Sequence, residues 1–463
     1  MSLLIRNAEV AGTPGIDVSI AGDTVTSVAA AGDRPASGAG FDAAGGALIP
    51  GLHDHHVHLR AMLAAANSLQ LSNHLTAAAI SATLRRHRGG AGWLRAVGGS
   101  GREFEAMTAA DLDGVVGARP TRIQHVSGAM WLLNTAALDA LDVAHWPEPG
   151  VERTPDGTPT GRLFRLDDRL RHALGPDDPS PDQPNPDEAA SEQAWARLSD
   201  DALRLGITGF TDATATRAAT DAGRFADLVG RGIIRQQLSL MGVGTAPAKF
   251  ILDDPRLPEP GELAARLAQA HDSGRPVAIH CVTAPQLLVA LAAWEISGSA
   301  PGDRVEHAGI VAPGCAEQLA ARGIAVVTQP GFLAARGDRY LAEVEPAERA
   351  WLYPCASLLA AGVAVGFSSD APFGPLDPWL AIRTAATRSS ASGAVLNAAE
   401  RVDAATALNA YLGRPEDVTR RRRVAPGEPA RLCLLDAPLR EVLREPDAAR
   451  IRAVILGEQV VTV

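Results

Sequence analysis

Four histidines fall within six residues of this chain, in the segment Pro50–His58. His56 and His58 stand two positions apart at the end of an apolar stretch, and His53 and His55 have the same spacing. Residues i and i+2 of a β-strand point to the same face, so either pair of imidazoles can reach one cation. The spacing alone leaves open which pair does so. Paired imidazoles at a strand end are typical of a site for zinc or a similar divalent metal.

Three further residues with suitable chemistry also follow short apolar segments: His280, His307 and Asp370. Asp370 has a structural interpretation as the N-cap of the next helix, and a functional one as a metal-bound carboxylate that moves protons. Catalytic residues of a parallel barrel gather at the carboxyl ends of its strands. We therefore expect these three side chains to share one site with the histidine pair.

Lys249 is the single lysine among the 43 basic residues of the chain. A general preference for arginine explains its isolation without any function. A buried lysine can also lose its proton and react with carbon dioxide, and the resulting carbamate can bridge two metal ions, whereas arginine stays a cation. Nitrogen and oxygen ligands without thiolates suit zinc, manganese or iron, with zinc the default. Such ions lower the pKa of bound water from ~15.7 to about 7.

The elements that must position these residues follow from the hydrophobic pattern. Through the middle of the chain, short apolar runs alternate with longer segments of helical spacing, which predicts a parallel sheet and, with this many units, a TIM-type (β/α)8 barrel over residues 48–424. Short alternating segments at both ends predict a composite β-sandwich from residues 1–47 and 425–463. The proline- and aspartate-rich stretch at residues 175–187 predicts an exposed loop.

The composition excludes several classes of protein. Hydrophobic residues make up 46% of the chain, which is enough for a large core. The net charge of −10 and the lack of basic clusters interleaved with aromatics argue against nucleic-acid binding. Four scattered cysteines favour a cytoplasmic protein without a disulfide framework, and no segment has the ~20 apolar residues of a membrane span. The sequence indicates a small-molecule substrate and leaves a homo-oligomer open.

Several motifs resemble the amidohydrolase superfamily, most closely its YtcJ-like branch (amidohydrolase 3 type), which includes N-substituted formamide deformylases. The likeness covers nearly the whole chain. The segments that carry it are Pro50–Leu59, Ser127–Leu138, Pro159–Gly161, Gly206–Thr208, Ala248–Ile251, Ala278–His280, Val305–Ala308, Phe367–Pro372 and Pro375–Pro378.

The resemblance implies a metal-dependent hydrolase that attacks a carbon–nitrogen bond with a metal-activated hydroxide. It sets the register of the histidine segment on His56 and His58, which with Asp370 hold the first metal ion. The resemblance likewise implies that His280 and His307 hold the second metal ion. A carboxylated Lys249 bridges the two ions, and Asp370 passes a proton to the leaving nitrogen.

Several positions depart from the family pattern. The family's histidine after Ser-Gly is Ala129, a frequent glutamate is Arg165, and the acid expected after His280 is missing. The Asp-Gly pair expected soon after Lys249 is also absent. The reaction class survives these changes, but the substrate of any relative does not carry over. The candidates for substrate binding, each with an alternative role in packing, are His125, Ser127, Arg165, Gln329 and Tyr353.

Two other functions remain as alternatives. A mononuclear deaminase of a nitrogen heterocycle usually has a glutamate a few residues after the position of His280, but the first one here is Glu295, a full helix away. A non-catalytic barrel relative predicts broken metal ligands, whereas every ligand position is filled. The sequence therefore favours hydrolysis of an amide, formamide or cyclic amide.

Overall fold

A computed structural model describes residues 2–30, 39–71, 76–89, 92–174, 188–215 and 221–463. The chain divides into two compact units. The barrel unit comprises Met1–His58 and Ala196–Val463, and the insertion unit comprises Leu59–Trp195. The loop expected at residues 175–187 lies outside the described residues.

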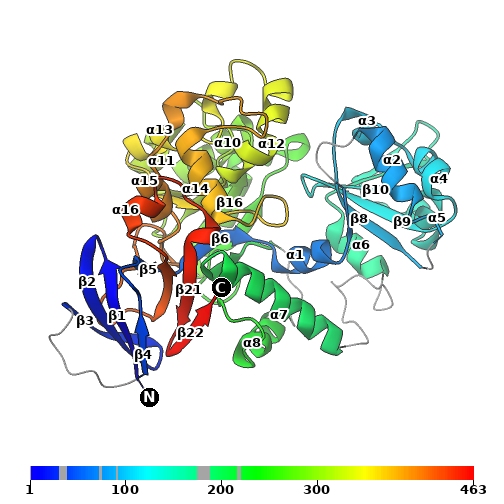
Figure 1. Ribbon diagram of the computed structural model, residues 1–463. Helices are drawn as coiled ribbons and strands as arrows, with labels where there is room; N and C mark the ends of the chain where they lie inside the picture. The colour runs from blue at the N-terminus through cyan, green and yellow to red at the C-terminus, as the bar shows by residue number, and fades with distance from the viewer. Residues whose placement is uncertain (1, 31–38, 72–75, 90–91, 175–187, 216–220) are drawn as a thin grey trace. The chain divides into compact units, whose positions relative to one another are not determined.

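Both ends of the barrel unit contribute to a pair of small sheets. One has the strand order β3-β2-β1-β4, and the other has the order β22-β21-β20-β5. Figure 1 shows the blue strands β1–β4 beside the red strands β21 and β22. Ile5, Val18, Leu432 and Ile455 belong to one core that both sheets share. The bounds are β1 Ser2–Val10, β2 Thr13–Ala21, β3 Thr24–Ala30, β4 Ala39–Asp42, β5 Leu48–Pro50, β20 Arg431–Leu435, β21 Ile451–Leu456 and β22 Gln459–Thr462.

Within the described residues of this unit, eight further strands form the barrel in chain order, with parallel pairing inside each hydrogen-bonded group. They make two hydrogen-bonded groups, β14-β13-β6 and β15-β16-β17-β18-β19, and β19 also contacts β6. The expected (β/α)8 barrel with a β-sandwich domain is therefore confirmed. The strands are β6 Leu52–Val57, β13 Ile207–Asp212, β14 Gln237–Leu240, β15 Ala248–Ile251, β16 Val277–Cys281, β17 Arg304–His307, β18 Ala325–Thr328 and β19 Val365–Phe367.

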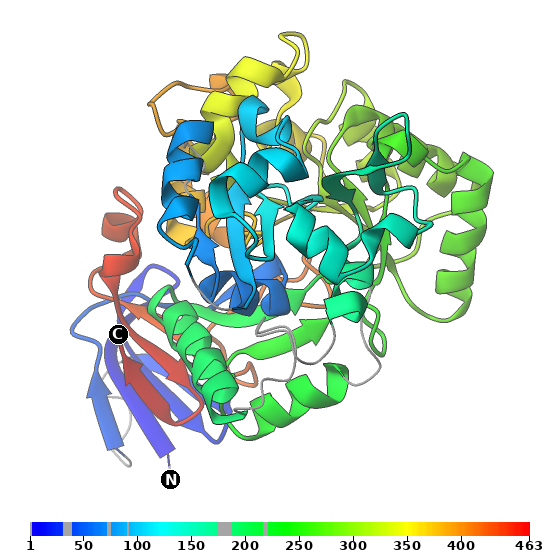
Figure 2. The same cartoon turned by 90° about the vertical axis from the view of Figure 1, so that its right-hand side faces the viewer.

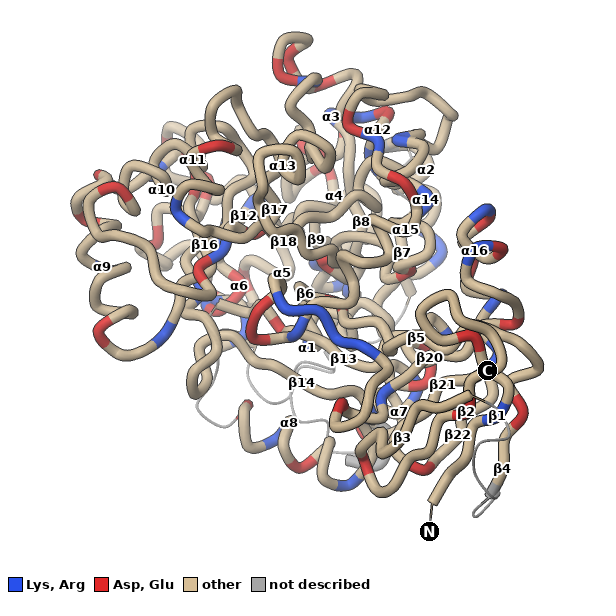
Figure 3. The backbone as a smooth tube through the Cα atoms, turned by 90° about the vertical axis from the view of Figure 1, so that its left-hand side faces the viewer, with Lys and Arg blue, Asp and Glu red and all other residues tan. Residues whose placement is uncertain are grey.

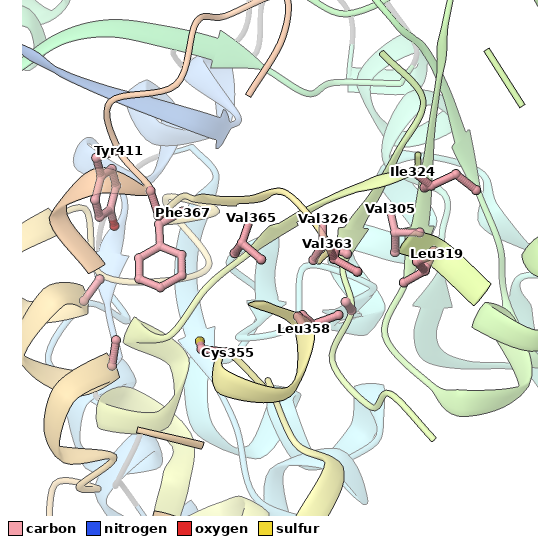
Figure 4. Close-up of a cluster of buried hydrophobic side chains, with 14 of the residues drawn as sticks. Val305, Leu319, Ile324, Val326, Cys355, Leu358, Val363, Val365, Phe367 and Tyr411 are labelled. Atoms are coloured by element: carbon pink, nitrogen blue, oxygen red, sulfur yellow. The ribbon is translucent and has the colours of Figure 1, made fainter. Parts of the chain in front are cut away.

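Helices follow the strands in the chain and provide the outer layer of the barrel core. Figure 4 shows Val305, Val326 and Val365 of three neighbouring strands gathered with Leu319 and Leu358 of two helices. Since side chains alternate along a strand, the neighbours of Val305 on β17 point to the opposite face. The helices are α7 Glu188–Arg204, α8 Asp221–Gly230, α9 Pro260–Asp272, α10 Ala284–Ser297, α11 Cys315–Ala321, α12 Gly331–Glu343, α13 Ala356–Ala360, α14 Pro378–Thr387, α15 Ala404–Asn409 and α16 Leu439–Val442.

The insertion unit has a six-stranded sheet of its own, in the order β11-β12-β10-β9-β8-β7 (cyan in Figure 2). Leu84, Ala96, Leu112 and Ile123 belong to a separate hydrophobic core. Its strands are β7 Leu69–Gln70, β8 Leu94–Gly99, β9 Thr121–His125, β10 Met130–Leu133, β11 Val151–Arg153 and β12 Pro159–Phe164. Its helices are α1 Leu59–Ala66, α2 Ala77–Arg85, α3 Arg102–Glu105, α4 Ala109–Val116, α5 Thr135–Ala140 and α6 Asp167–Leu174.

The expected division of the chain did not include this unit. The sequence pattern assigned residues 48–424 to one barrel domain, whereas Leu59–Trp195 form a compact unit after the first barrel strand. The physical reason is that these residues bury their own sheet against their own helices and so need no place in the barrel wall.

The sequence has a net charge of −10. Acidic and basic residues are interspersed along the chain in Figure 3. Among the described residues, no helix combines the length and the apolar character that crossing a bilayer demands.

Candidate metal centre

His56, His58 and Asp370 lie together at the end of the first and last barrel strands. One ligand atom from each falls within 4.8 Å of the other two. Nε2 of His56 lies 3.5 Å from Oδ1 of Asp370, and Nε2 of His58 lies 3.2 Å from the same oxygen. Two imidazoles and a carboxylate at this spacing can bind a single divalent cation.

A bulge in β6 separates this pair from the other two histidines of the segment. Between Asp54 and Val57, β6 advances three residues while β13 advances two, from Phe210 to Asp212. The extra residue in β6 changes the face of the strand to which the side chains after the bulge point. His53 instead has Nε2 2.8 Å from the hydroxyl of Thr211, deep in the barrel.

His307 and His280 extend the cluster along two neighbouring strands. The ring centroids of His56 and His307 are 4.8 Å apart, and those of His307 and His280 are 4.5 Å apart. Nδ1 of His307 lies 4.0 Å from Oδ2 of Asp370. The four imidazoles and the carboxylate therefore form one continuous group, which is the arrangement that the strand-end argument predicts.

Backbone conformation and hydrogen bonds hold Asp370 over β6. The amide of Asp370 donates to the carbonyl of His56 at 2.9 Å, and the amide of His58 donates to the carbonyl of Ala371 at 2.9 Å. Asp370 and His307 both have positive φ, of 55° and 72°, which non-glycine residues adopt at a cost of about 1–3 kcal/mol. The surrounding contacts hold the backbone in these conformations at the two residues.

The electrostatic environment keeps the imidazoles of His56 and His307 neutral and the carboxylate of Asp370 charged. Burial lowers the pKa of His56 to about 3 and also lowers the pKa of His307. Burial by itself raises the pKa of Asp370, but the hydrogen bond from His58 and the nearby His307 and His56 bring it below its ordinary value. Neutral imidazoles and an ionised carboxylate are the forms that bind metals.

Lys249, on β15, fits the chemistry of a carbamate. The residue as a whole is partly exposed, but Nζ is buried and makes no hydrogen bond to any described residue. Burial lowers the pKa of Lys249 to about 8, against the opposing effects of Glu306 and Asp370. An amine that loses its proton this readily is available to carbon dioxide, although the carbamate itself stays a prediction.

Two buried acids that the sequence pattern does not single out contact this cluster. Glu306 accepts a hydrogen bond from Nδ1 of His56, and its other oxygen accepts one from Nε of Arg304 at 2.6 Å. Asp54 accepts hydrogen bonds from the amides of Ser369, at 3.0 Å, and His56, at 3.3 Å, and burial raises its pKa to about 7. In the sequence, the only indication of their role is that each is a charged residue inside an apolar strand, close to a metal-ligand candidate.

Gln329 and Tyr353, expected near the substrate, lie in the barrel unit. Oε1 of Gln329 accepts a hydrogen bond from Nδ1 of His307 at 3.0 Å, and Nε2 donates to the hydroxyl of Ser368 at 2.8 Å. Tyr353 is buried beside Phe332, with ring centroids 5.8 Å apart. Gln329 is thus engaged with a metal-ligand candidate, and a contact of either residue with substrate stays a prediction.

The other three substrate candidates belong to the insertion unit, where each has local contacts. Nδ1 of His125 lies 2.7 Å from the hydroxyl of Ser127, and Nε2 lies 3.1 Å from a carboxylate oxygen of Glu105. The amide of Arg165 donates to the carbonyl of Ala129 at 2.9 Å. These contacts are internal to the unit, and the substrate roles stay predictions.

The barrel and its strand-end cluster of imidazoles and carboxylate define the class of metal-dependent hydrolases with a TIM-type barrel. Residues 39–462 match the model of the amidohydrolase family, and the chain belongs to that family. It is accordingly a hydrolase acting on carbon–nitrogen bonds other than peptide bonds.

Known proteins resemble the chain over most of its length. An N-substituted formamide deformylase from Arthrobacter pascens is 27% identical, over 86% of this chain and 84% of the relative. The putative amidohydrolase YtcJ of Bacillus subtilis (strain 168) is 24% identical, over 79% of each chain. The structure of an uncharacterized metal-dependent hydrolase from Pyrococcus horikoshii has a TM-score of 0.71 at 19% identity, over 94% of this chain and 97% of that one. The formamide deformylase and YtcJ agree with the branch that the motifs indicated.

Proposed function

We propose that this protein cleaves the carbon–nitrogen bond of a small amide, formamide or cyclic amide at the strand-end cluster. The observation that carries the proposal is the convergence of His56, His58 and Asp370, whose ligand atoms lie within 4.8 Å of one another. The similarity to an N-substituted formamide deformylase supports this group of substrates.

The proposed ligands form two sets, with Lys249 shared between them. His56, His58 and Asp370 hold one divalent ion, and His280 and His307 hold a second, with a carboxylated Lys249 between them. The set contains nitrogen and oxygen atoms only, which favours zinc. The buried Nζ of Lys249, without a hydrogen-bond partner among the described residues, supports the bridging role. When bound, such ions supply a water molecule whose pKa is about 7 and polarise the substrate carbonyl.

Asp370 is the proposed proton shuttle. One of its oxygens faces His56 and His58, and the other faces His307, so the carboxylate borders both sets of imidazoles. The histidines keep the pKa of Asp370 below its usual range, so the carboxylate is free to accept a proton from the attacking water. It then returns this proton to the leaving nitrogen, which departs as a neutral amine.

A mononuclear deaminase is the second candidate. It requires one set of ligands only, whereas His280 and His307 continue the cluster with their rings 4.5 Å apart. This second group of imidazoles favours the binuclear hydrolase.

Metal analysis of the purified protein, combined with a substrate screen, tests the proposal. We expect close to two zinc ions per chain, with release of an amine from N-formyl or N-acyl compounds or ring opening of cyclic amides. One ion per chain with release of ammonia from a nitrogen heterocycle would favour the deaminase. A protein without bound metal would contradict both functions.

A further inference from the structure

The buried carboxylate of Glu306 is the contact that fixes the orientation of His56. The side chain of Glu306 is fully buried on β17. Oε2 accepts a hydrogen bond from Nδ1 of His56, and Oε1 accepts one from Nε of Arg304 at 2.6 Å. Both oxygens are thus engaged within the protein, and Glu306 acts on the metal centre only through its neighbours.

Arg304 makes this arrangement stable in the barrel interior. It is itself 3% exposed, and its Nη2 donates to the carbonyl of His55 at 3.2 Å. A buried carboxylate without a paired cation is strongly destabilising, so the guanidinium keeps Glu306 ionised at this position. Because the guanidinium occupies one oxygen, a single oxygen of Glu306 is left for His56.

The geometry defines which nitrogen of His56 carries the proton. An ionised carboxylate accepts hydrogen bonds and cannot donate them, so Nδ1 of His56 must be the donor. A neutral imidazole carries one proton, so the lone pair then lies on Nε2. Nε2 is the atom that lies 3.5 Å from Asp370 and faces the cluster.

We propose that Glu306, held by Arg304, is a positioning residue that locks His56 in the Nδ1–H tautomer and thereby sets the affinity of the first metal site. The inference rests on the proposed function, because it assumes that His56 is a metal ligand. It assigns a role to two residues outside the proposed ligand set.

The substitution Glu306→Gln tests the tautomer and leaves the shape of the side chain almost unchanged. A carboxamide has one acceptor oxygen, and in the variant this oxygen accepts the hydrogen bond from the permanently charged Arg304. The NH2 group then faces Nδ1 of His56 and donates to it, which moves the imidazole proton to Nε2, where a metal must bind. Loss of a partner of this kind typically weakens metal binding 10- to 100-fold.

Asp303→Asn is the matched control. Asp303 is another buried carboxylate next to an imidazole, with Nε2 of His271 3.1 Å from its oxygen, and it stands immediately before β17. It also accepts a hydrogen bond from the indole of Trp294 at 2.9 Å. This substitution therefore disturbs a similar buried network near the start of the same strand, without touching His56.

The experiment measures the zinc affinity of the full-length variants by competition with a chromophoric chelator, with circular dichroism as the check on folding. We expect zinc binding about 10- to 100-fold weaker in Glu306→Gln, and unchanged in Asp303→Asn. Wild-type affinity in Glu306→Gln, or equal weakening in both variants, would overturn the inference. A wild-type protein that binds no zinc would instead overturn the proposed function.

A second measurement does not depend on how the variant folds. Nitrogen-15 spectra of histidine-labelled, metal-free wild-type protein distinguish the two tautomers, and the His56 signals are those missing from His56→Gln. We expect the proton on Nδ1. A proton on Nε2 would overturn the inference even if Glu306→Gln fails to fold.

Discussion

Asp54 on β6 accepts a hydrogen bond from the backbone amide of Ser369, the residue before Asp370, at 3.0 Å. The same carboxylate also accepts the amide of His56 at 3.3 Å. One buried acid thus links the strand that carries His56 to the segment that carries Asp370. This link adds to the direct hydrogen bond from the amide of Asp370 to the carbonyl of His56.

Asp54→Ala is expected to lower both stability and activity. The substitution leaves the buried amide of Ser369 without its partner, which costs about 1–3 kcal/mol, and frees Asp370 to move. Urea unfolding and zinc titration measure the two effects. Asp54→Asn keeps one acceptor oxygen and serves as the control, with a smaller loss expected. Equal zinc affinity in wild type and Asp54→Ala would contradict the positioning role.

Asp370→Asn is expected to abolish turnover and leave the fold intact. The amide cannot accept the proton from the attacking water, and general acid–base steps of this kind contribute roughly 10²- to 10⁴-fold. The rate of amine release from the best substrate of the screen gives the loss, and circular dichroism checks the fold. Activity close to that of the wild type would refute the role of Asp370.

Lys249→Arg is expected to reduce the occupancy of one metal site. Arginine keeps a positive charge at the position and cannot form a carbamate, so the bridge between the two ions is lost. Elemental analysis after loading with zinc in bicarbonate buffer should give close to one ion per chain, against two for the wild type. Full occupancy of both sites in the variant would rule out the bridge.

The lowered pKa of Lys249 also predicts how stability varies with pH in metal-free protein. The folded-state pKa is about 8, below the ordinary value of 10.5. Below pH 8 the buried amine is charged and destabilises the fold, and this penalty disappears as the pH rises from 8 to 10.5. The wild type should therefore gain stability relative to Lys249→Met between pH 7.5 and about 10 in urea unfolding. A difference that does not change with pH would contradict a buried amine.

The hydrophobic pattern predicts the barrel and the strand-end positions of the histidine and aspartate candidates, because each lies at or shortly after the end of an apolar strand. His280 and His307 illustrate this, since their strands are adjacent and parallel. The insertion unit could not be predicted in the same way. Its strands, such as Leu94–Gly99, join a separate sheet, and the periodicity of a segment does not tell which sheet a strand joins.

Glu306 and Asp54 are residues of the site that could not be predicted from the sequence. Each is a carboxylate whose burial depends on partners distant in the chain: His56 for Glu306, and Ser369 for Asp54. No local pattern encodes such pairs, since tertiary packing brings the partners together. The same holds for Gln329, whose amide contacts His307 and Ser368.

Anomalous X-ray diffraction at the zinc edge, from crystals of the zinc-loaded protein, tests the shared metal centre most directly. The account predicts a strong peak within about 2.0–2.2 Å of the nitrogens of His56 and His58 and of a carboxylate oxygen of Asp370, with a second peak beside His280 and His307. Zinc-loaded crystals without a peak among these residues, or with zinc bound elsewhere, would contradict it.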